Sequence, residues 1–539
     1  MQAVAARTNQ VYYRDLREWL ALVEDFGELA VVEGADWNLE IGALSELNYR
    51  RKPYPALLFD RIKDYAPGFR LLTGATGSSR RFGTCLRFST DMTDLELVEA
   101  LRGRPLYWET NAQRYPAQVV PDGPVNENVL EGAAVDLSRF PVPFWHEHDG
   151  GRYIGTGSSV ITSDPDTGVT NVGAYRCMLL DDKRVTLQII PGKHGYVHYQ
   201  KWWAQEGRAP VVISLGHDPL LFCLSGVEVP TGVSEIDYYG AIVGEPLEVL
   251  RSDLTPLPIP ARAEIVLEGW LYPDKKGREG PFGEWTGYYS GSLLPSPVLE
   301  VQRLRYRDNP ILLGSPPSKP PHDYSYMRTA MKSAMIYDAL VKAGVPDVRG
   351  VWADECGGGR LLIVVSITQR FCGHSRQAGA IAAQCREAAY MNRFVVVVDD
   401  DIDPTNLEEV VWAMCTRCDP AEDIDILRKA WGSRADPMLQ DGQPPYNSRA
   451  IIDACRPYEW IKEFPRVAEG SPELLRQVET KWADLFAHRP GQAPGVGGVE
   501  RAARWFANGA DGTGAGDDAM ARGGEPLPTD MAAGEQRVP

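Results

Sequence analysis

The sequence has few cysteines and no pattern that would organise them. Nine cysteines are scattered over 539 residues, whereas a disulfide-stabilised secreted domain has an even, dense set. The one close pair, Cys415 and Cys418, lies in an apolar helical pattern without the second pair that a zinc site needs. We expect packed thiols at this pair, with redox or metal chemistry as the alternative.

Long apolar runs, an excess of basic residues and a signal peptide are also missing. No run approaches the ~18 apolar residues of a membrane-spanning helix. The first ten residues lack the apolar centre of a signal peptide. A formal net charge of −17 disfavours nucleic acids and anionic membranes, because both attract basic surfaces. The sequence therefore predicts a soluble cytoplasmic protein that binds neither.

The chain does contain enough apolar residues for several cores. With 539 residues, 44% of them hydrophobic, two or three domains are expected in a mixed α/β fold. We predict an N-terminal α/β unit at residues 1–110, a β-rich central domain at 111–320 and a C-terminal α/β domain at 321–488. The last helix of that domain serves either assembly or ordinary packing. Residues 489–539 are poor in apolar residues and predict a disordered tail.

Several segments have a clear periodicity. A helix is predicted from Leu16 to Phe26, where apolar residues recur at helical spacing before Gly27. Residues 361–398 predict a strand, a helix and a second strand, the pattern of a parallel βαβ unit. The next helix is expected to begin at Asp403–Pro404, a capping residue followed by a first-turn proline. A last helix is expected from Ser471 to about Phe486.

The most informative stretch is REGPFGEWTGY at residues 278–288. Glu279 and Glu284 are separated by Gly-Pro-Phe-Gly, in which proline restricts the backbone and the glycines permit unusual dihedral angles. A rigid loop is therefore expected, after a buried strand at 263–270. Two neighbouring carboxyl groups can divide their work, one staying ionised and the other holding a transferable proton. A surface turn with two solvated glutamates has the same spacing.

A resemblance to a known family favours the first interpretation. EGPFGEWTGYY at 279–289 resembles the glutamate loop of the UbiD family, decarboxylases that use prenylated FMN. Three further matches follow the family order: TNVGAYR at 170–176, GKH at 192–194 and PTGVSE at 230–235. The resemblance extends from about Asp15 to about Asp436. It implies that the central domain is a split β-barrel that binds the flavin.

The resemblance implies a catalytic set of Arg176, Glu279 and Glu284. A substrate carboxylate is held best by a planar, permanently charged guanidinium group. Glu279 is the expected anionic partner that orients Arg176, and Glu284 is the expected proton donor once CO₂ has left. An apolar neighbourhood from Phe282 and Trp285 would favour the protonated form of that donor. Without the resemblance, Arg176 would be interpreted as part of a structural salt bridge.

The resemblance also implies a metal site at the flavin phosphate. Members of the family bridge phosphate and protein with a divalent cation, usually Mn²⁺, often with K⁺ nearby. The matching ligands are Asn171, His194 and Glu235, whose amide, imidazole and carboxylate groups suit a hard to borderline cation. His198 is the alternative histidine, but His194 fits the family spacing.

Further cofactor contacts are carried over from the family. They are Thr156, Gly173, Ala174, Tyr175, Arg176, Lys193 and Ser225. Two positions depart from the family pattern. Its phosphate-contacting lysine falls on Glu387, so Arg386 or Lys193 is expected to replace it. A flavin-adjacent proline of some members is Glu228 here.

The regions that line the substrate pocket in the family supply six candidates. They are Ile190, Trp285, Pro320, His322, Asp323 and Tyr390. His322 and Asp323 either bind a ring hydroxyl or ring nitrogen of the substrate, or lie behind the pocket or at the surface.

The sequence thus predicts a non-oxidative decarboxylase of an aromatic, heteroaromatic or α,β-unsaturated acid, with reversal at high CO₂ left open. Its implied cofactors are prenylated FMN, Mn²⁺ and K⁺, and its implied partner is a UbiX-type flavin prenyltransferase. A homodimer or homohexamer is implied by resemblance. The alternatives are a flavin-independent, metal-dependent hydrolase or lyase, and a non-catalytic accessory subunit of a decarboxylase.

Overall fold

The computed structural model describes residues 11–227, 229, 232–290, 294–440 and 442–486. The chain divides into two units, residues 1–465 and 466–539. The tail predicted from residue 489 and the family departure at Glu228 therefore lie outside the described residues. The domain boundaries of the sequence analysis stay a prediction.

The N-terminal part combines a small sheet with short helices. The sheet has the order β1 (Leu29–Glu33), β2 (Ala56–Asp60), β3 (Arg70–Thr73) and β18 (Ile311–Leu313). The helices are α1 (Leu16–Asp25), α2 (Glu40–Tyr49), α3 (Ser79–Cys85), α4 (Asp94–Leu101) and α5 (Arg104–Asn111). Asp15 caps α1 by accepting from the N–H groups of Arg17 and Glu18. Gly27 follows it with a φ of 77°, so the predicted first helix is confirmed.

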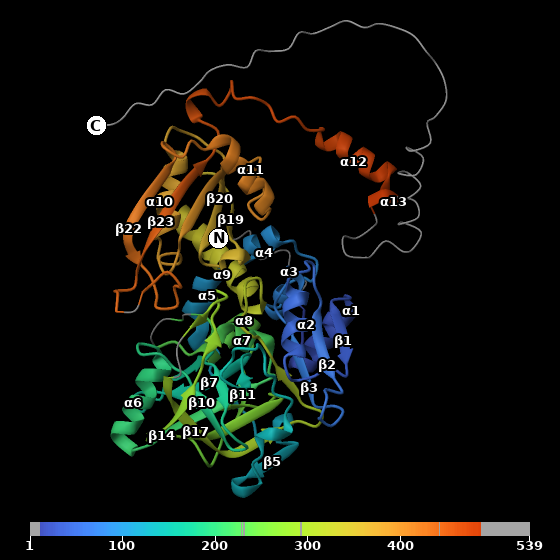
Figure 1. Ribbon diagram of the computed structural model, residues 1–539, viewed down its shortest axis with the longest axis vertical. Coiled ribbons are helices and arrows are strands. Elements are labelled where there is room, and N and C mark those ends of the chain that lie inside the picture. Colours follow the sequence, from blue (N-terminus) through green and yellow to red (C-terminus); the bar gives the residue numbers. More distant parts are fainter. Residues whose placement is uncertain (1–10, 228, 230–231, 291–293, 441, 487–539) are drawn as a thin grey trace, which may run out of the picture. The chain divides into compact units, whose positions relative to one another are not determined.

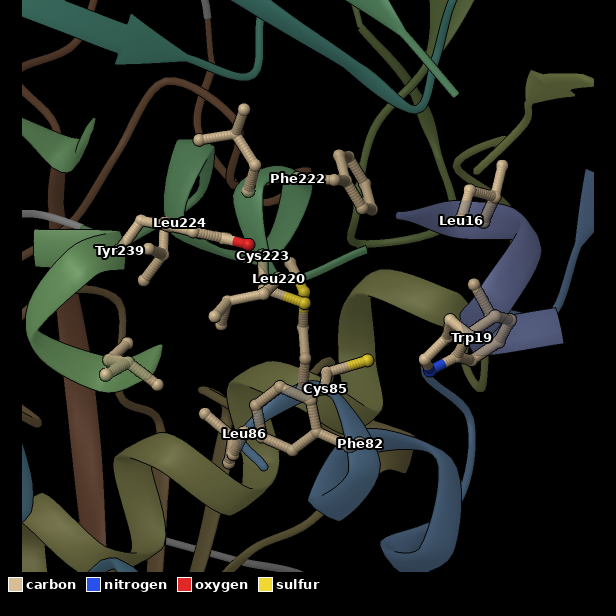
Figure 2. Close-up of a cluster of buried hydrophobic side chains, with 14 of the residues drawn as sticks. Leu16, Trp19, Phe82, Cys85, Leu86, Leu220, Phe222, Cys223, Leu224 and Tyr239 are labelled. Carbon is tan, nitrogen blue, oxygen red and sulfur yellow. The ribbon is translucent and has the colours of Figure 1, made fainter. Parts of the chain in front are cut away.

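A hydrophobic core joins α1 and α3 to two helices of the central part, α7 (Pro219–Ser225) and α8 (Glu235–Val243). Figure 2 shows side chains of this core meeting between these elements, with Trp19 from α1, Phe82 from α3 and Phe222 from α7. Each of the three is at most 2% exposed. The packing fixes α7 and α8, which carry the predicted site residues Ser225 and Glu235 at their ends.

The central part is a curled antiparallel sheet (Figure 1). Its strand order is β6 (Tyr153–Gly155), β9 (Cys177–Leu179), β10 (Arg184–Leu187), β17 (Leu294–Tyr306), β14 (Ile265–Glu279), β11 (Ala209–Leu215), β7 (Ser158–Ser163) and β8 (Thr170–Gly173). β5 (Asn128–Glu131) also pairs with β17. All seven residues of β11 are buried, as expected for a central strand rich in β-branched residues. The mixed α/β fold with a central half-barrel is confirmed.

Smaller elements complete the central part. Helix α6 (His194–Glu206) packs against β7 and β11. β12 (Glu248–Leu250), β13 (Ile259–Pro260) and β4 (Gln118–Val119) form a separate sheet.

The C-terminal part of the first unit is a five-stranded sheet with helices on both faces. The strand order is β19 (Val348–Ala353), β20 (Leu362–Ile367), β21 (Phe394–Asp399), β23 (Tyr446–Ala454) and β22 (Ile424–Trp431). Alternate residues of β21 face opposite sides, as a strand requires. Val395 and Val397 join the core beneath α9 (Asp323–Lys342) and α10 (His374–Gln384). Val396 and Val398 join the core beneath α11 (Leu407–Arg417).

The parallel pairing of β20 with β21 around α10 confirms the predicted βαβ unit. The predicted start of the next helix is wrong. Asp403 accepts from the N–H of Thr405 in a local turn, and α11 begins after Asn406, which accepts from two N–H groups of the first turn. The side chain of Cys415 is exposed, so the expectation of a packed thiol is wrong there.

The second unit contains α12 (Pro472–Lys481) and α13 (Ala483–Phe486). Ser471 caps α12 by accepting from the N–H of Leu474, as the sequence predicts. Among the described residues, no helix combines the length and apolar character that crossing a membrane requires.

Candidate active site

The two glutamates of the 278–288 stretch are held by a hairpin. Glu279 is the last residue of β14 and pairs with the first residue of β17. After a cis Gly280–Pro281 peptide, β15 (Phe282–Gly283) pairs with β16 (Tyr289–Ser290). The Glu284 N–H donates to the Tyr288 carbonyl at 2.9 Å, and the Gly287 N–H donates to the Glu284 carbonyl at 2.8 Å. The expected rigid loop is thus a short hairpin with a hydrogen-bonded turn.

A close backbone approach holds this hairpin against the chain before β6. The Gly150 N–H donates to the Pro281 carbonyl at 2.7 Å. A Cβ atom at position 150 would lie 2.0 Å from the Gly280 carbonyl oxygen. Because real Cβ contacts are never that short, position 150 requires glycine.

Arg176 lies between both glutamates. Its Nε is 2.8 Å from Glu279 Oε1, its Nη2 donates to Glu279 Oε2 at 2.8 Å, and its Nη1 donates to Glu284 Oε1 at 3.4 Å. Burial lowers the pKa of Arg176, but the hydrogen bond and charge of Glu279, together with the charge of Glu284, outweigh it and raise the pKa. The guanidinium group is therefore permanently charged and rigidly oriented.

The two carboxylates have different surroundings. The Glu279 side chain is fully buried, whereas that of Glu284 keeps 31% of its surface exposed. Glu279 also accepts from the Tyr153 hydroxyl at 2.7 Å. Burial, and then the charge of Glu279, raise the pKa of Tyr153, which stays protonated as a donor. Glu279 is thus held among largely buried partners, whereas Glu284 contacts Arg176 Nη1 at 3.4 Å and has access to solvent.

The sequence predicts that Phe282 forms part of an apolar neighbourhood around Glu284, but the Phe282 ring packs on Tyr153. Its ring stacks on Tyr153 with centroids 3.7 Å apart, and the Arg176 guanidinium carbon is 5.7 Å from its centroid. Phe282 therefore supports the Arg176–Glu279 pair. Tyr153 extends the site beyond the residues expected from sequence, because no local motif marks its role.

The three predicted metal ligands come from three elements. Asn171 is in β8, His194 opens α6 and Glu235 opens α8. Glu235 Oε2 accepts from the N–H of Val172, the residue after Asn171, at 2.7 Å. Burial raises the pKa of Glu235 to about 7. Asn171 and Glu235 are both buried, and the Asn171 Nδ2, a donor, has no hydrogen-bond partner among the described residues.

Tyr175 connects this pair to His194. The Tyr175 ring packs against both Gly173 and Gly195. A Cβ atom added at Gly173 would lie 2.3 Å from its Cε2, and one added at Gly195 would lie 3.0 Å from the same atom. Burial raises the pKa of Tyr175 and outweighs the opposing effect of the nearby Asn171 side chain and Gly195 N–H. The ring of His194 lies 6.5 Å from that of His198. The Nδ1 of His198 is hydrogen-bonded to the Thr162 hydroxyl at 3.1 Å. Burial lowers the pKa of His198 to about 4.

The remaining predicted cofactor contacts lie around the same strand. The Ala174 N–H donates to the Ser225 carbonyl at 2.9 Å, and the Ser225 hydroxyl donates to the Leu221 carbonyl at 2.8 Å. Thr156 Oγ1 accepts from the Ser315 N–H at 3.0 Å. Lys193 is an exposed residue immediately before α6. At the position of the family lysine, the Glu387 carbonyl accepts from Lys332.

The predicted pocket residues fall into two groups. Trp285, His322 and Tyr390 lie together: His322 Nε2 is 3.3 Å from the Trp285 carbonyl, and Trp285 and Tyr390 both contact Arg360. Asp323 instead accepts from the Tyr49 hydroxyl at 3.1 Å and the Gly74 N–H at 2.8 Å. It therefore holds α9 to the N-terminal part.

The two other predicted pocket residues, Ile190 and Pro320, are both less buried than His322. The Ile190 side chain is 54% exposed. Pro320 is half-buried and precedes Pro321 through a cis peptide.

A cavity of about 220 Å³ lies elsewhere, beside Tyr13, Asp218 and Tyr239. None of the residues predicted for catalysis, cofactor or substrate lines it. Asp218, which lines the cavity, forms a buried ion pair with Arg87 at 2.7 Å and accepts from the hydroxyls of Tyr13 and Tyr239, each at 2.7 Å. This network pairs the charges of Arg87 and Asp218, and Asp218 caps the N-terminal end of α7, opposite to Ser225 at its C-terminal end.

Three family models together match most of the chain. They describe the N-terminal, Rift-related and C-terminal domains of 3-octaprenyl-4-hydroxybenzoate carboxy-lyase, UbiD, and match residues 20–101, 118–320 and 325–454. Pyrrole-2-carboxylic acid decarboxylase of Pseudomonas aeruginosa is 32% identical over 492 residues, covering 87% of this chain and 98% of the relative.

Solved structures of related enzymes have the same fold. The UbiD-class enzyme HmfF from Pelotomaculum thermopropionicum in complex with FMN matches with a TM-score of 0.75 and 30% identity, over 86% of this chain and 99% of HmfF. An evolved dimeric form of HmfF in complex with prFMN matches with a TM-score of 0.72 and 28% identity, over 86% and 98% of the two chains.

Proposed function

Because the chain belongs to the UbiD family of carboxy-lyases, we propose that it is a non-oxidative decarboxylase of an aromatic, heteroaromatic or α,β-unsaturated acid. Its proposed cofactor is prenylated FMN, since related structures bind FMN and prFMN. The observation that carries the proposal is the bridge from Arg176 to both Glu279 and Glu284. An accessory subunit would have no chemical need for a charged, oriented arginine beside a solvent-accessible carboxyl group.

Arg176 has one edge that is not saturated by Glu279. Glu279 takes Nε and Nη2 at 2.8 Å, whereas Nη1 has only the 3.4 Å contact with Glu284. In the proposed mechanism the Nη1 edge holds the substrate carboxylate, and Glu279 with Tyr153 keeps the guanidinium plane in place.

In the proposed mechanism, Glu284 lies next to the bond that breaks. After CO₂ leaves, the carboxyl group of Glu284 gives its proton to the carbon that carried the carboxylate, and solvent then restores the proton through its exposed edge. The cofactor, when bound, supplies the electron sink for the breaking C–C bond.

The residues around β8 fit a phosphate-bound cation. No group of three or more His, Cys, Asp or Glu side chains suited to a metal is present in the described part of the chain, so the proposed set relies on the amide of Asn171 with His194 and Glu235. In the proposed set, the amide oxygen of the buried Asn171 and the buried carboxyl group of Glu235 are the oxygen ligands. Mn²⁺ is the proposed ion, with K⁺ nearby; Thr156, Gly173, Ala174, Tyr175, Lys193 and Ser225 are the proposed flavin contacts.

The function is tested by co-expression with a UbiX-type flavin prenyltransferase, the proposed source of the cofactor. The purified protein is expected to show a flavin-like absorbance band and the mass of prenylated FMN. It is also expected to release CO₂ from at least one acid of a panel of aromatic, heteroaromatic and cinnamate-type acids. Activity in protein that contains no flavin would favour the metal-dependent hydrolase or lyase instead. A homodimer or homohexamer in the cytoplasm is the proposed state of the enzyme.

His194→Ala is expected to lower Mn²⁺ and flavin occupancy together, because the imidazole is the only nitrogen in the proposed ligand set. Occupancy is measured by metal analysis and absorbance after gel filtration. His198→Ala is the matched control on the same helix, since His198 already contacts Thr162. If occupancy falls in His198→Ala and not in His194→Ala, the ligand must be reassigned.

A further inference from the structure

Arg360 is a cation beside the candidate active site that has no ion pair or hydrogen-bonded anion among the described residues. It follows the Gly357–Gly359 turn that leads into β20. Its Nε and Nη1 are buried and have no hydrogen-bond partner in the part of the chain that the structure describes. Its guanidinium carbon lies 5.8 Å from the ring centroid of Trp285 and 5.0 Å from that of Tyr390.

The position of Trp285 ties Arg360 to the catalytic hairpin. Trp285 directly follows Glu284, and its indole packs so closely on Gly358 that a Cβ there would lie 2.7 Å from Cε3. His322 approaches the Trp285 carbonyl. Arg176 therefore contacts Glu284, and Arg360 contacts the next residue in the chain.

A second arginine supports the same indole. The Arg328 guanidinium carbon is 5.2 Å from the Trp285 ring and 4.4 Å from the Tyr324 ring, and its Nη1 donates to the Gly358 carbonyl at 3.0 Å. This contact fixes the turn that carries Arg360. The Arg360 side chain is thus held by aromatic rings and a braced turn, without a carboxylate of its own.

Arg360 is half-buried, and two buried guanidinium nitrogens without hydrogen bonds are unfavourable, a cost that contacts with aromatic faces offset only in part. Its natural complement is a planar oxyanion that accepts two parallel hydrogen bonds. Two sources of such an anion exist near the site: a second acidic group on the substrate, and the phosphate of the cofactor. The proposed phosphate ligands lie on β8, α6 and α8, whereas Arg360 adjoins the residue after the proton donor.

We propose that Arg360, framed by Trp285 and Tyr390, binds a second carboxylate of the substrate, so that the preferred substrate is an aromatic or heteroaromatic dicarboxylic acid. The inference rests on the proposed decarboxylase function, in which Arg176 holds the carboxylate that leaves. Arg360 then determines specificity by binding the carboxylate that remains on the product. Without this cation, a desolvated carboxylate would be poorly bound.

The test compares pyrrole-2-carboxylate with pyrrole-2,5-dicarboxylate on the cofactor-loaded enzyme. Wild type is expected to prefer the dicarboxylate in kcat/KM. Arg360→Gln is expected to reduce the dicarboxylate-to-monocarboxylate ratio of kcat/KM about 10- to 100-fold, mainly through KM, as for loss of a charge-assisted hydrogen bond. Arg360→Lys, which keeps the charge without the fork, is expected to lie between the two. Arg370→Gln, at an exposed arginine paired with Asp347, is the control and should leave the ratio unchanged.

Binding separates this inference from the reaction itself. Calorimetric titration of both acids into Glu284→Gln holoenzyme, with and without Arg360→Gln, measures affinity without turnover. Arg360-dependent binding of the dicarboxylate supports the second-anion site even if no CO₂ is released from either acid by wild type, which would refute only the decarboxylase assignment. CO₂ release with a ratio that Arg360→Gln does not change overturns the inference and keeps that assignment. Loss of flavin with an unchanged ratio also overturns it, and assigns Arg360 to the cofactor phosphate.

Discussion

Glu284→Gln is expected to abolish turnover while the protein retains its flavin. The amide has the size of the carboxyl group and can still accept from Arg176 Nη1, whose present distance to Glu284 is 3.4 Å. It cannot deliver a proton to carbon at a useful rate. General acid–base groups typically contribute about 10²- to 10⁴-fold, and a larger loss is expected here because no other carboxylate contacts Arg176 from the open side in the described residues.

The measurement is CO₂ release together with exchange of the product's ring hydrogen for deuterium, because the exchange reports the proton transfer alone. Glu147→Gln serves as the control. Glu147 is exposed and close enough to β16 to influence Tyr289 electrostatically, but it does not contact Arg176. Deuterium exchange in Glu284→Gln at the wild-type rate would remove Glu284 from the role of proton donor.

Local elements of the fold could be predicted because their signals are local. The buried face of α1 and the alternating β20–α10–β21 unit follow from periodicity within one segment. The start of α11 was mispredicted because two neighbouring capping patterns compete: Asp403 is used in a turn, and Asn406 three residues later caps the helix. Sequence spacing does not show which of the two residues meets the first free N–H groups.

The candidate site could be predicted only through resemblance to a family. Arg176 and Glu279 are brought together by β-sheet pairing between distant strands, and no local pattern links them. Tyr153, the third group on Glu279, has no motif and was missed. Arg360 was missed for the same reason, since its contact with Trp285 joins the C-terminal sheet to the hairpin. Asp323 is the opposite case. It belongs to a region that lines the pocket in the family, but its carboxyl group accepts hydrogen bonds from Tyr49 and Gly74.

Glu279→Gln is expected to reduce kcat/KM about 100-fold or more, through a lower kcat and a higher KM. Glu279 accepts two hydrogen bonds, from the Tyr153 hydroxyl and Arg176 Nη2, and its Oε1 also lies 2.8 Å from Arg176 Nε in the ion pair. An amide has only one oxygen, so its NH₂ group must face a donor in either orientation. The fully buried site offers no water to relieve that clash. Arg176 then loses its anion and its fixed plane, and a misplaced guanidinium group costs affinity and rate together.

Tyr153→Phe is the matched variant for this argument, because it removes one donor and leaves the Arg176–Glu279 ion pair intact. Its expected loss in kcat/KM is about tenfold, in line with one hydrogen bond to a charged group. Steady-state kinetics of both variants with flavin content held equal measure the difference. If the two variants lose activity equally, Tyr153 and not the ion pair orients Arg176. If Glu279→Gln keeps wild-type kcat and KM, the buried carboxylate serves only the fold. The ranking of the two variants therefore decides whether the Arg176–Glu279 pair is machinery for substrate binding or a structural salt bridge at the end of β14.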